Sequence, residues 1–416
     1  MSLSAEIIAV GTELLLGNIA NTDAQMVSQA LSELGINVYY HTVVGDNPER
    51  LKAAVSLARS RADIIITTGG LGPTFDDLTK QTVAAAFGKK LVENADELEK
   101  LHTYFSRIDR PMTKNNEQQA FLPEGCEVLT NPWGTAPGCA FCSDGVHVIM
   151  LPGPPRECRP MMYERAIPYL RRLSDACIVS HEIHIFGMGE SAVEDKIRSL
   201  AETMENPTLA PYAKEGEVLL RVTGKAASED EADAMTRPVI SAVSELLGDV
   251  IYGIDVASLP AVVVNALAAR GLTLATAESC TGGLISKMIT DVAGASDVFV
   301  GGVCAYSNDV KASQLGVPMD VIECYGAVSP EVARYLARGA ARALGASLGV
   351  GVTGIAGPNG GTDEKPVGTI YLAVYADGIC WCRKLSGKRD RAQNRNMAAL
   401  SVFDMLRRYL ENGNCR

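Results

Sequence analysis

The segment that most constrains the fold is residues 69–77, which reads GGLGPTFDD and directly follows the apolar run of residues 64–68. A short β-branched run that ends in glycines is typical of a buried parallel strand whose carboxyl end opens into a loop. In open α/β sheets, ligands bind at that edge. Gly69, Gly70 and Gly72 let backbone N–H groups approach a phosphate closely, because no Cβ stands in the way.

Two adjacent carboxylates, Asp76 and Asp77, end this segment and begin a predicted helix. Glycine-rich backbone followed by paired oxygen ligands favours a phosphate ester held together with a divalent cation. The alternative is a plain glycine turn whose aspartates cap the helix. The local sequence is compatible with both interpretations, and the surrounding sequence pattern favours the phosphate and cation site.

Length and charge narrow the class of protein. A chain of 416 residues is too long for one core and predicts two or three domains. A net charge of −11 argues against a nucleic-acid backbone as the main partner, because phosphate contacts need a basic face. No apolar stretch reaches membrane-spanning length, and the first residues read as a strand, not a signal peptide. We therefore expect a cytoplasmic protein with no nucleic-acid or membrane partner.

Cysteine and histidine usage argues against zinc. The eleven cysteines are scattered without a disulfide framework, which predicts reduced thiols. Cys139 and Cys142 form a CxxC pattern and Cys380 and Cys382 a CxC pattern, but neither has a second pair at a compatible spacing. The five histidines form no HExxH motif, so a zinc-hydrolase signature is missing.

The first part of the chain alternates strands and helices. The predicted strands are 5–10, 38–44, 63–68 and 146–151, and the predicted helices are 24–34 and 49–59. This spacing indicates βαβ units with a parallel sheet. Glycine- and proline-rich loops at 132–138 and 152–155 flank the last of these strands, and rigid loops of this kind often line binding sites.

The pattern changes near Ala176. Predicted strands at 181–186 and 217–223 and helices at 190–203 and 228–247 make a small α+β module, and residues 252–259 read as a linker. A new α/β unit then begins, with predicted strands at 273–276, 298–306, 348–353 and 369–375 and helices at 261–269, from Leu284, at 330–344 and at 391–410.

The third part repeats the arrangement of a strand followed by a polar loop. The loop AESCTGG contains Glu278, Ser279, Thr281, Gly282 and Gly283. Hydroxyls and free N–H groups at the start of a helix form a cradle for an anion or a carboxamide. A second glycine loop, 352–369, supplies Thr353 and Gly354, and residues 301–311 supply Tyr306, Asn308 and Lys311.

A hydrolase without histidine or metal signatures can use serine with a lysine base. Ser296 with Lys311 is one candidate pair and Ser279 with Lys311 is another, and spacing alone does not choose between them. The alternative is that Ser296 is a turn residue and Lys311 a solvated helix lysine.

The whole chain resembles the CinA family (competence/damage-inducible protein). The matching motifs are GTELLLG, GGLGPTFDDLT, NPWGTAPG, LPGPPRE, FGMGES, AESCTGG, YSNDVK and VTGIAGPNGGTDEKPVGT. Residues 1–170 resemble the family's molybdopterin-binding-like domain, implied to be a metal-dependent ADP-ribose pyrophosphatase. Residues 171–254 resemble its KH-like connector. Residues 255–416 resemble a PncC-type nicotinamide mononucleotide (NMN) deamidase domain, so the implied fold class is α/β throughout, with an α+β connector.

The resemblance also implies residue roles. In the deamidase domain it assigns the nucleophile to Ser296, the base to Lys311 and substrate positioning to Tyr306, with no cofactor. Substrate binding is implied for Glu278, Ser279, Thr281, Gly282, Gly283, Asn308, Thr353, Gly354, Arg391 and Arg395. In the N-terminal domain it implies nucleotide binding by Gly69, Gly70, Gly72, Thr74, Thr135 and Gly138, with Mg, Mn or Co at Asp76 and Asp77. Glu13 and Glu157 are weaker candidates.

Three functions compete at this point. The first is a bifunctional NAD-salvage hydrolase that deamidates NMN and cleaves ADP-ribose, assembled as a homodimer. The second leaves the N-terminal domain as a pterin- or nucleotide-binding module without turnover. The third is an accessory factor in competence or DNA recombination, against which the acidic charge argues.

Overall fold

Strand β3 (Ile64–Thr68) lies inside a six-stranded sheet in the computed structural model, which describes residues 3–173, 177–387 and 389–415. The order of this sheet is β2-β1-β3-β8-β7-β6. Four strands pair in parallel: β1 (Ser4–Val10), β2 (Asn37–Val44), β3 and β8 (Val146–Leu151). The edge formed by β7 (Gly138–Ser143) and β6 (Glu127–Leu129) is antiparallel.

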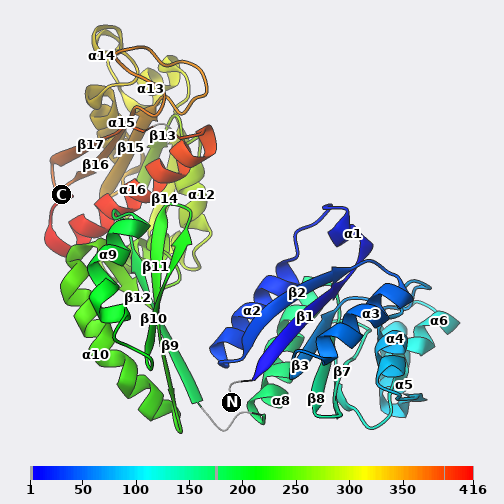
Figure 1. The fold of residues 1–416 in the computed structure, drawn as a ribbon. Coiled ribbons are helices and arrows are strands. Elements are labelled where there is room, and N and C mark those ends of the chain that lie inside the picture. Colours follow the sequence, from blue (N-terminus) through cyan, green and yellow to red (C-terminus); the bar gives the residue numbers. More distant parts are fainter. Residues whose placement is uncertain (1–2, 174–176, 388, 416) are drawn as a thin grey trace. The chain divides into compact units, whose positions relative to one another are not determined.

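Helices cover both faces of this sheet (Figure 1). One core contains Ile64 and Ile66 and residues of α2 (Thr22–Glu33) and α7 (Pro155–Met161). The other contains Ile65 and residues of α3 (Pro48–Arg59) and α4 (Thr79–Ala86). Because successive strand residues point to opposite faces, an uninterrupted apolar strand such as β3 needs this covering on both sides.

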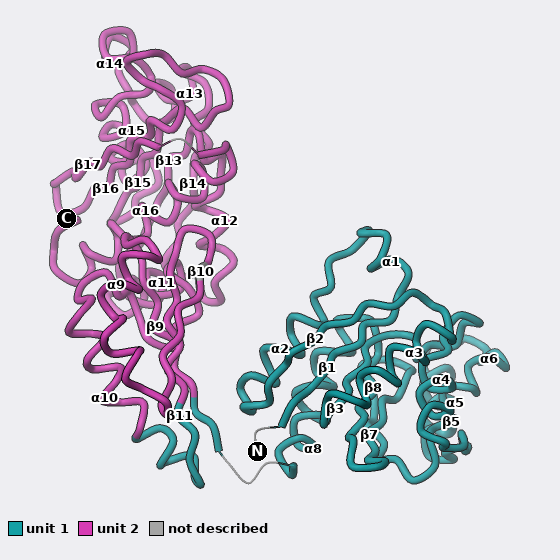
Figure 2. The backbone as a smooth tube through the Cα atoms, in the orientation of Figure 1, with its two compact units in different colours: residues 1–179, 224–234 teal, residues 180–223, 235–416 magenta. Residues whose placement is uncertain are grey.

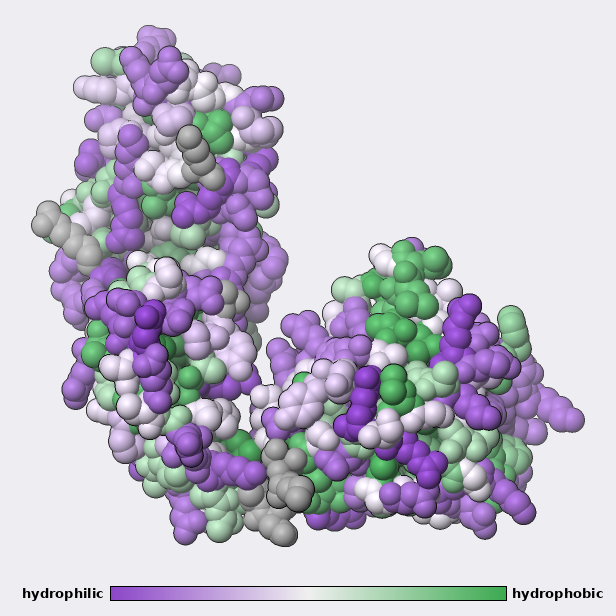
Figure 3. Space-filling view, in the orientation of Figure 1, coloured by the Kyte–Doolittle hydropathy of each residue, from purple (hydrophilic) through white to green (hydrophobic). Residues whose placement is uncertain are grey.

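Further elements extend this part of the chain beyond the predicted ones. The short strands β4 (Leu91–Glu93) and β5 (Phe121–Pro123) pair with each other. Helices α1 (Thr12–Leu15), α5 (Ala95–Arg107), α6 (Lys114–Glu117) and α8 (Ile167–Arg171) complete it, and a π-helical turn, η2 (Met162–Ala166), joins α7 to α8. Around α1, the exposed side chains of Leu15, Leu16 and Ile19 form an apolar patch (Figure 3).

The connector has four strands, not the two that were predicted. Their order is β10 (Thr208–Lys214), β11 (Glu217–Ala226), β9 (Cys177–Ile185) and β12 (Ile251–Ile254). Helices α9 (Glu190–Ala201) and α10 (Glu229–Leu247) complete the module. The prediction of a linker at 252–259 was wrong for its first residues, because β12 pairs with β9 and Tyr252 is buried against His184.

The C-terminal sheet has the order β14-β13-β15-β16-β17. Its strands β14 (Phe299–Cys304), β13 (Leu274–Glu278) and β15 (Leu348–Gly354) are parallel, and β16 (Ile370–Ala376) and β17 (Ile379–Leu385) are antiparallel. Helices α11 (Leu259–Arg270), α12 (Leu284–Thr290) and α16 (Arg391–Asn412) contribute to one core, and α13 (Asn308–Leu315), α14 (Met319–Tyr325) and α15 (Pro330–Leu344) to the other.

Two compact units divide the chain: residues 1–179 with 224–234, and residues 180–223 with 235–416 (Figure 2). Most of the connector therefore shares a unit with the C-terminal sheet. The predicted change of pattern near Ala176 lies outside the described residues. None of the helices formed by the described residues combines the length and apolar character needed to cross a membrane.

A buried ionic cluster ties the second unit together. Asp404 on α16 is buried and accepts hydrogen bonds from Arg407 Nη2 at 2.9 Å, Arg408 Nε at 3.1 Å and Arg383 Nη1 of β17 at 3.1 Å. Arg407 also donates to the backbone carbonyl of Asp249 in the connector at 2.9 Å. The cluster thus joins the connector, β17 and α16.

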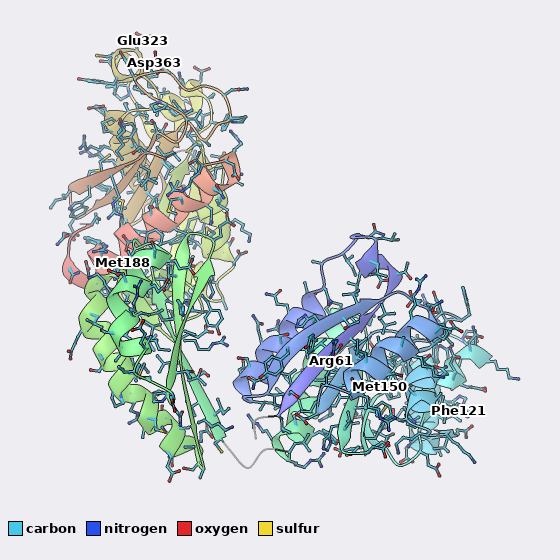
Figure 4. All side chains as sticks on the ribbon, viewed as in Figure 1. Arg61, Phe121, Met150, Met188, Glu323 and Asp363 are labelled. Atoms are coloured by element: carbon cyan, nitrogen blue, oxygen red, sulfur yellow. The ribbon has the colours of Figure 1, made fainter. Side chains whose placement is uncertain are left out.

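Replacing Asp404 by asparagine should destabilise this unit by about 3–5 kcal/mol, because it leaves buried arginines without their counter-charge. Thermal unfolding of the full chain measures the effect. Asp363, in an exposed loop at the end of the C-terminal part (Figure 4), supplies the control Asp363→Asn, which should leave the midpoint unchanged. Equal midpoints for both variants would contradict the role given to Asp404.

Candidate functional site

The turn after β3 requires glycine for steric reasons. Gly69 has φ 94°, and a Cβ at this position would lie 2.2 Å from the carbonyl oxygen of Val10 at the end of β1. Gly70 has φ 68°, and a Cβ there would lie 2.1 Å from Thr79 Oγ1 at the start of α4. The turn is therefore pressed between the ends of β1 and β3 and the beginning of α4.

Asp76 and Asp77 lie in this turn and do not begin the helix as predicted, because α4 starts at Thr79. Thr74 joins them: its hydroxyl is within hydrogen-bond reach of both carboxylates, and its N–H donates to Asp77 Oδ2 at 2.9 Å. Two carboxylates and a hydroxyl on an exposed turn are hard oxygen donors. This donor set fits a cation such as Mg²⁺, which is usually held by one or two carboxylates together with water and substrate phosphates.

A buried lysine that the sequence analysis missed lies next to this turn. Lys80 is 2% exposed, and its Nζ donates to the carbonyl oxygens of Gln118 at 3.1 Å and Gln119 at 2.7 Å. Burial lowers the pKa of Lys80 to about 8, while Cys139 and Asp77 favour its charged form. Its cation is therefore placed to offset negative charge near Asp77. In the sequence, the only signal for this lysine was its place near the start of the predicted helix, in the segment TKQT.

Residues 118 and 119 connect the turn to the predicted loop at 132–138. The side-chain amide of Gln118 donates to the carbonyl oxygens of Gly72 and Thr74, at 3.5 and 3.3 Å. The side-chain amide of Gln119 donates to Thr135 Oγ1 at 3.1 Å. Thr135 is thus linked to the glycine turn through these two neighbouring glutamines.

Glu157 is not a solvated surface carboxylate. It is buried, and its Oε2 accepts a hydrogen bond from Asn131 Nδ2 at 2.8 Å. A Cβ at Gly134 would lie 1.9 Å from the same oxygen, so the loop wraps closely around this carboxylate. Gly138 has a packing role: it begins β7, and a Cβ there would lie 2.6 Å from the carbonyl oxygen of Met150.

Asp23 is a further acidic residue that the site predictions did not include. It lies in the first turn of α2, where burial raises its pKa to about 6. Burial raises the pKa of Cys158 on α7, the helix that follows the loop at 152–155, and the charge of Asp23 adds to this.

In the C-terminal sheet, Glu278 organises the start of α12. It is 1% exposed at the end of β13. Oε2 accepts the N–H groups of Gly283 at 3.0 Å and Ile285 at 3.1 Å, and Oε1 accepts the N–H and hydroxyl of Ser286 at 2.8 and 2.7 Å. Glu278 therefore shapes the AESCTGG loop from inside instead of facing a substrate.

Ser279 and Lys311 occupy the same edge of the sheet. The N–H of Ser279 donates to the carbonyl oxygen of Val352 at 3.0 Å, and the N–H of Ala305 donates to that of Glu278 at 2.8 Å, so the ends of β13, β14 and β15 meet here. Lys311 is 2% exposed, and its Nζ donates to the carbonyl oxygen of Tyr306 at 3.1 Å. Burial lowers the pKa of Lys311, and the thiol of Cys280, the neighbour of Ser279, partly offsets this.

Ser296 lies at the opposite end of the sheet. It is exposed in a short turn that precedes β14, whereas Lys311 follows the carboxyl end of that strand. The six residues of β14 span about 20 Å at roughly 3.3 Å per residue. Within one chain, Ser296 and Lys311 therefore lie at opposite ends of β14, and Ser279 is the candidate that shares a sheet edge with Lys311.

Most of the other predicted substrate residues lie near Ser279. Arg395 Nη2 donates to the carbonyl oxygen of Thr281 at 2.6 Å, and Thr281 Oγ1 is buried without a partner among the described residues. Arg391 Nη1 donates to the carbonyl oxygen of Gly357 in the second glycine loop at 2.7 Å. Gly282 and Gly283 have φ of 59° and 90°, which glycine adopts without strain.

Three of the residues predicted to bind substrate have structural roles or lie at the margin of the candidate site. The hydroxyl of Thr353 donates to the carbonyl oxygen of Ala327 at 2.7 Å and is buried. Gly354 is required by packing, because a Cβ there would lie 2.6 Å from Ile370 Cγ1. Asn308 is exposed at the start of α13, close in sequence to the exposed Tyr306.

The cysteine pairs do not converge on a metal. All eleven cysteines are free, and no group of three or more His, Cys, Asp or Glu side chains that could hold a metal ion occurs among the described residues. Cys139 and Cys142 are three residues apart on β7, so one is buried and the other exposed.

Three models of known protein families match successive parts of this chain. A model of a probable molybdopterin binding domain matches residues 6–172, one of the damage-inducible protein CinA KH domain matches 180–253, and one of the CinA C-terminal domain matches 256–410. The predicted fold class, a molybdopterin-binding-like domain, a KH-like connector and a C-terminal α/β domain, is confirmed.

Full-length relatives were also found. A CinA-like protein from Kosmotoga olearia is 48% identical over 408 residues, which cover 98% of this chain and 99% of that protein. A putative competence-damage inducible protein from Acetivibrio thermocellus shows the same identity and coverage. A solved structure, the protein CinA with unknown function from Thermoplasma acidophilum, is 32% identical with a TM-score of 0.37, over 40% of this chain and 98% of that one.

Replacing Glu278 by glutamine should lower the unfolding free energy of the C-terminal domain by about 2–3 kcal/mol, because an amide N–H₂ would face N–H donors that now bind a charged oxygen. Denaturant unfolding of the full chain measures this. Glu364→Gln, on an exposed loop residue, is the matched control. An unchanged midpoint for Glu278→Gln would show that the carboxylate does not organise the loop.

Proposed function

This chain belongs to the CinA family, and we propose that it is a bifunctional hydrolase acting on breakdown products of NAD. In this proposal the C-terminal domain deamidates NMN to nicotinic acid mononucleotide and ammonia. The N-terminal domain hydrolyses the pyrophosphate of ADP-ribose with the help of a divalent metal. The observation that carries the first activity is the buried Lys311 at the same sheet edge as Ser279.

Ser279 acts as the nucleophile of the deamidation. Its hydroxyl oxygen attacks the carboxamide carbon, and Lys311 Nζ accepts the hydroxyl proton. That proton passes to the leaving nitrogen, which departs as ammonia, and water then hydrolyses the ester. The unpartnered hydroxyl of Thr281 is available to donate a hydrogen bond to the substrate. Arg391 and Arg395 supply positive charge for the phosphate of the mononucleotide.

Lys311 is suited to the role of base because it is buried. A lysine accepts a proton only when neutral, and burial disfavours its charged form. Its lowered pKa increases the neutral fraction at a given pH. Its hydrogen bond to the carbonyl oxygen of Tyr306 fixes the amine at the sheet edge.

In the N-terminal domain the glycine turn binds the phosphates. Asp76 and Asp77 would hold the divalent cation, which would neutralise charge on the pyrophosphate oxygens. The buried Lys80 adds a second positive charge close to Asp77. Thr135, joined to the turn through Gln119, borders the same site.

Ser279→Ala should lower kcat for NMN at least about 10³-fold, as loss of a nucleophile generally does. Lys311→Met should have a similar effect. Ser296→Ala, at the far end of β14, is the matched control and should retain turnover. Ammonia release from NMN in the presence of EDTA measures all three. Full activity of Ser279→Ala together with an inactive Ser296→Ala would assign the nucleophile to Ser296, through contacts not available within one chain.

The pH dependence of deamidation tests the base. Because only the neutral amine of Lys311 accepts a proton, kcat/KM for NMN should rise with pH and level off once Lys311 is deprotonated. The lowered pKa puts the midpoint of that rise below the ordinary lysine value of 10.5. A rate that falls steadily with pH between about 6 and 9 would contradict a neutral-lysine base.

Replacing both Asp76 and Asp77 by alanine should abolish ADP-ribose hydrolysis while NMN deamidation continues, since the two sites lie in separate domains. Product analysis with Mg, Mn or Co and with EDTA measures the first activity. The double variant Glu93→Ala/Glu124→Ala, which removes two exposed carboxylates of the same domain, is the matched control and should cleave ADP-ribose like the parent. If the double variant cleaves ADP-ribose as fast as the parent, or no metal supports cleavage by the parent, the domain is a binding module.

A further inference from the structure

A cavity of about 450 Å³ lies where the connector meets helix α16, within the second compact unit. Its walls are the loop at 186–190 between β9 and α9, which contains Met188 (Figure 4), the hairpin residues 214 and 216–218 of β10 and β11, and residues 389 and 397 at the start of α16. The volume falls within the range of about 300–1,000 Å³ that is usual for small-molecule sites. Neither proposed hydrolase activity uses these residues, so the motif FGMGES has no role in them.

Direct packing between the hairpin and α16 forms the cavity. The side-chain amide of Asn396 donates to the carbonyl oxygen of Glu215 at 3.5 Å. Gly216 has φ 86°, and a Cβ at this position would lie 2.9 Å from Leu400 Cδ1 on α16. The turn between β10 and β11 therefore needs glycine to approach the helix this closely, and one wall of the cavity is held by that contact.

Glu217 supplies a buried acceptor to this cavity. Its Oε1 is buried and has no hydrogen-bond partner among the described residues. Burial raises the pKa of Glu217, while a hydrogen bond from Tyr252 and the charge of Lys214 partly offset this. The hydroxyl of Tyr252 also lies 3.2 Å from His184 Nδ1 in the connector core. A buried oxygen without a donor costs stability, and a ligand with an ammonium group would supply a charge-assisted hydrogen bond.

The rest of the polar lining favours a small anionic group. Lys214 and Arg389 are exposed at the cavity, and Arg389 forms no ion pair with any residue that the structure describes. Helix α9 begins here with Gly189 as its N-cap and has no side-chain cap, so its first N–H groups are open to an acceptor. A polyphosphate would meet two carboxylates, Glu190 and Glu217, whereas a single carboxylate group needs only the two cations and the helix start.

Apolar side chains complete the lining between these polar groups. They are Phe186, Met188, Val218 and Met397. Methionine is unbranched and flexible, so it adapts to apolar groups of different shape. We propose that the cavity binds a free amino acid, with its ammonium group on Glu217 and its carboxylate toward Lys214 and Arg389. The side chain of the amino acid would then contact the two methionines.

Thermal unfolding of the full chain with each proteinogenic L-amino acid, added singly, tests the proposal without relying on turnover. A ligand that binds only the folded state raises the midpoint in proportion to its occupancy, so at least one amino acid should raise it. Isothermal titration then compares that amino acid with the same molecule lacking its amino group and with the same molecule lacking its carboxyl group. Each analogue should bind at least about tenfold more weakly, because it loses a charge-assisted hydrogen bond.

Two variants with matched controls assign the contacts. Glu217→Gln should weaken binding of the amino acid at least about tenfold, whereas Glu215→Gln, at an exposed carboxylate of the same turn, should bind it like the parent. Arg389→Met should weaken binding, and Arg342→Met, at an exposed arginine of α15, should not. Because Arg389 is exposed, its replacement is compatible with folding, which keeps the test decisive even if Glu217→Gln unfolds.

Three results would overturn the proposal. The first is an unchanged midpoint with every amino acid. The second is an analogue without the amino group that binds as tightly as the amino acid itself, which would make the cavity a plain anion site. The third is equal affinity of Arg389→Met and Arg342→Met, or of Glu217→Gln and Glu215→Gln, which would place the bound amino acid elsewhere on the protein.

Discussion

Buried parallel strands constrain both candidate sites in the same way. β3 and β13 are buried along their whole length, so their neighbours on both faces are covered and substrates can reach only their ends. The polar groups that could contact a substrate therefore lie at the carboxyl ends of these strands, in the turn after β3 and in the loop after β13. This constraint gives the two domains similar site positions, although their loops carry different chemical groups.

The groups at each edge are held by buried interactions rather than by the loops alone. In the C-terminal domain the carboxylate of Glu278 takes four donors from the start of α12, which fixes the loop that presents Ser279. In the N-terminal domain, close packing against Val10 and Thr79 demands glycine in the turn, and buried Glu157 holds the neighbouring loop through Asn131. The geometry of each candidate site thus depends on buried contacts beneath the residues that would bind the ligand.

The sequence predicted the βαβ order, the glycine turn and the polar loop after β13, because strand periodicity and glycine position are local signals. The residues alone did not decide between Ser279 and Ser296, and the family resemblance assigned the nucleophile to Ser296. The choice depends on which edge of the sheet each serine occupies, at the end of β13 or before β14. The edge strand β10 was missed because Pro211 interrupts its pattern, although an edge position tolerates proline. The cavity lined by α5 and Arg165 could not be predicted from the sequence, because only the fold brings these residues together.

The proposed deamidation requires NMN to bind at the carboxyl edge of β13, β14 and β15. A crystal structure of the Lys311→Met variant with NMN bound tests this most directly, since loss of the base should leave the substrate intact. We expect density for the carboxamide carbon within about 3–3.5 Å of Ser279 Oγ, a near-attack distance, with the phosphate toward Arg391 and Arg395. Density for NMN beside Ser296, at the opposite end of β14, would contradict it.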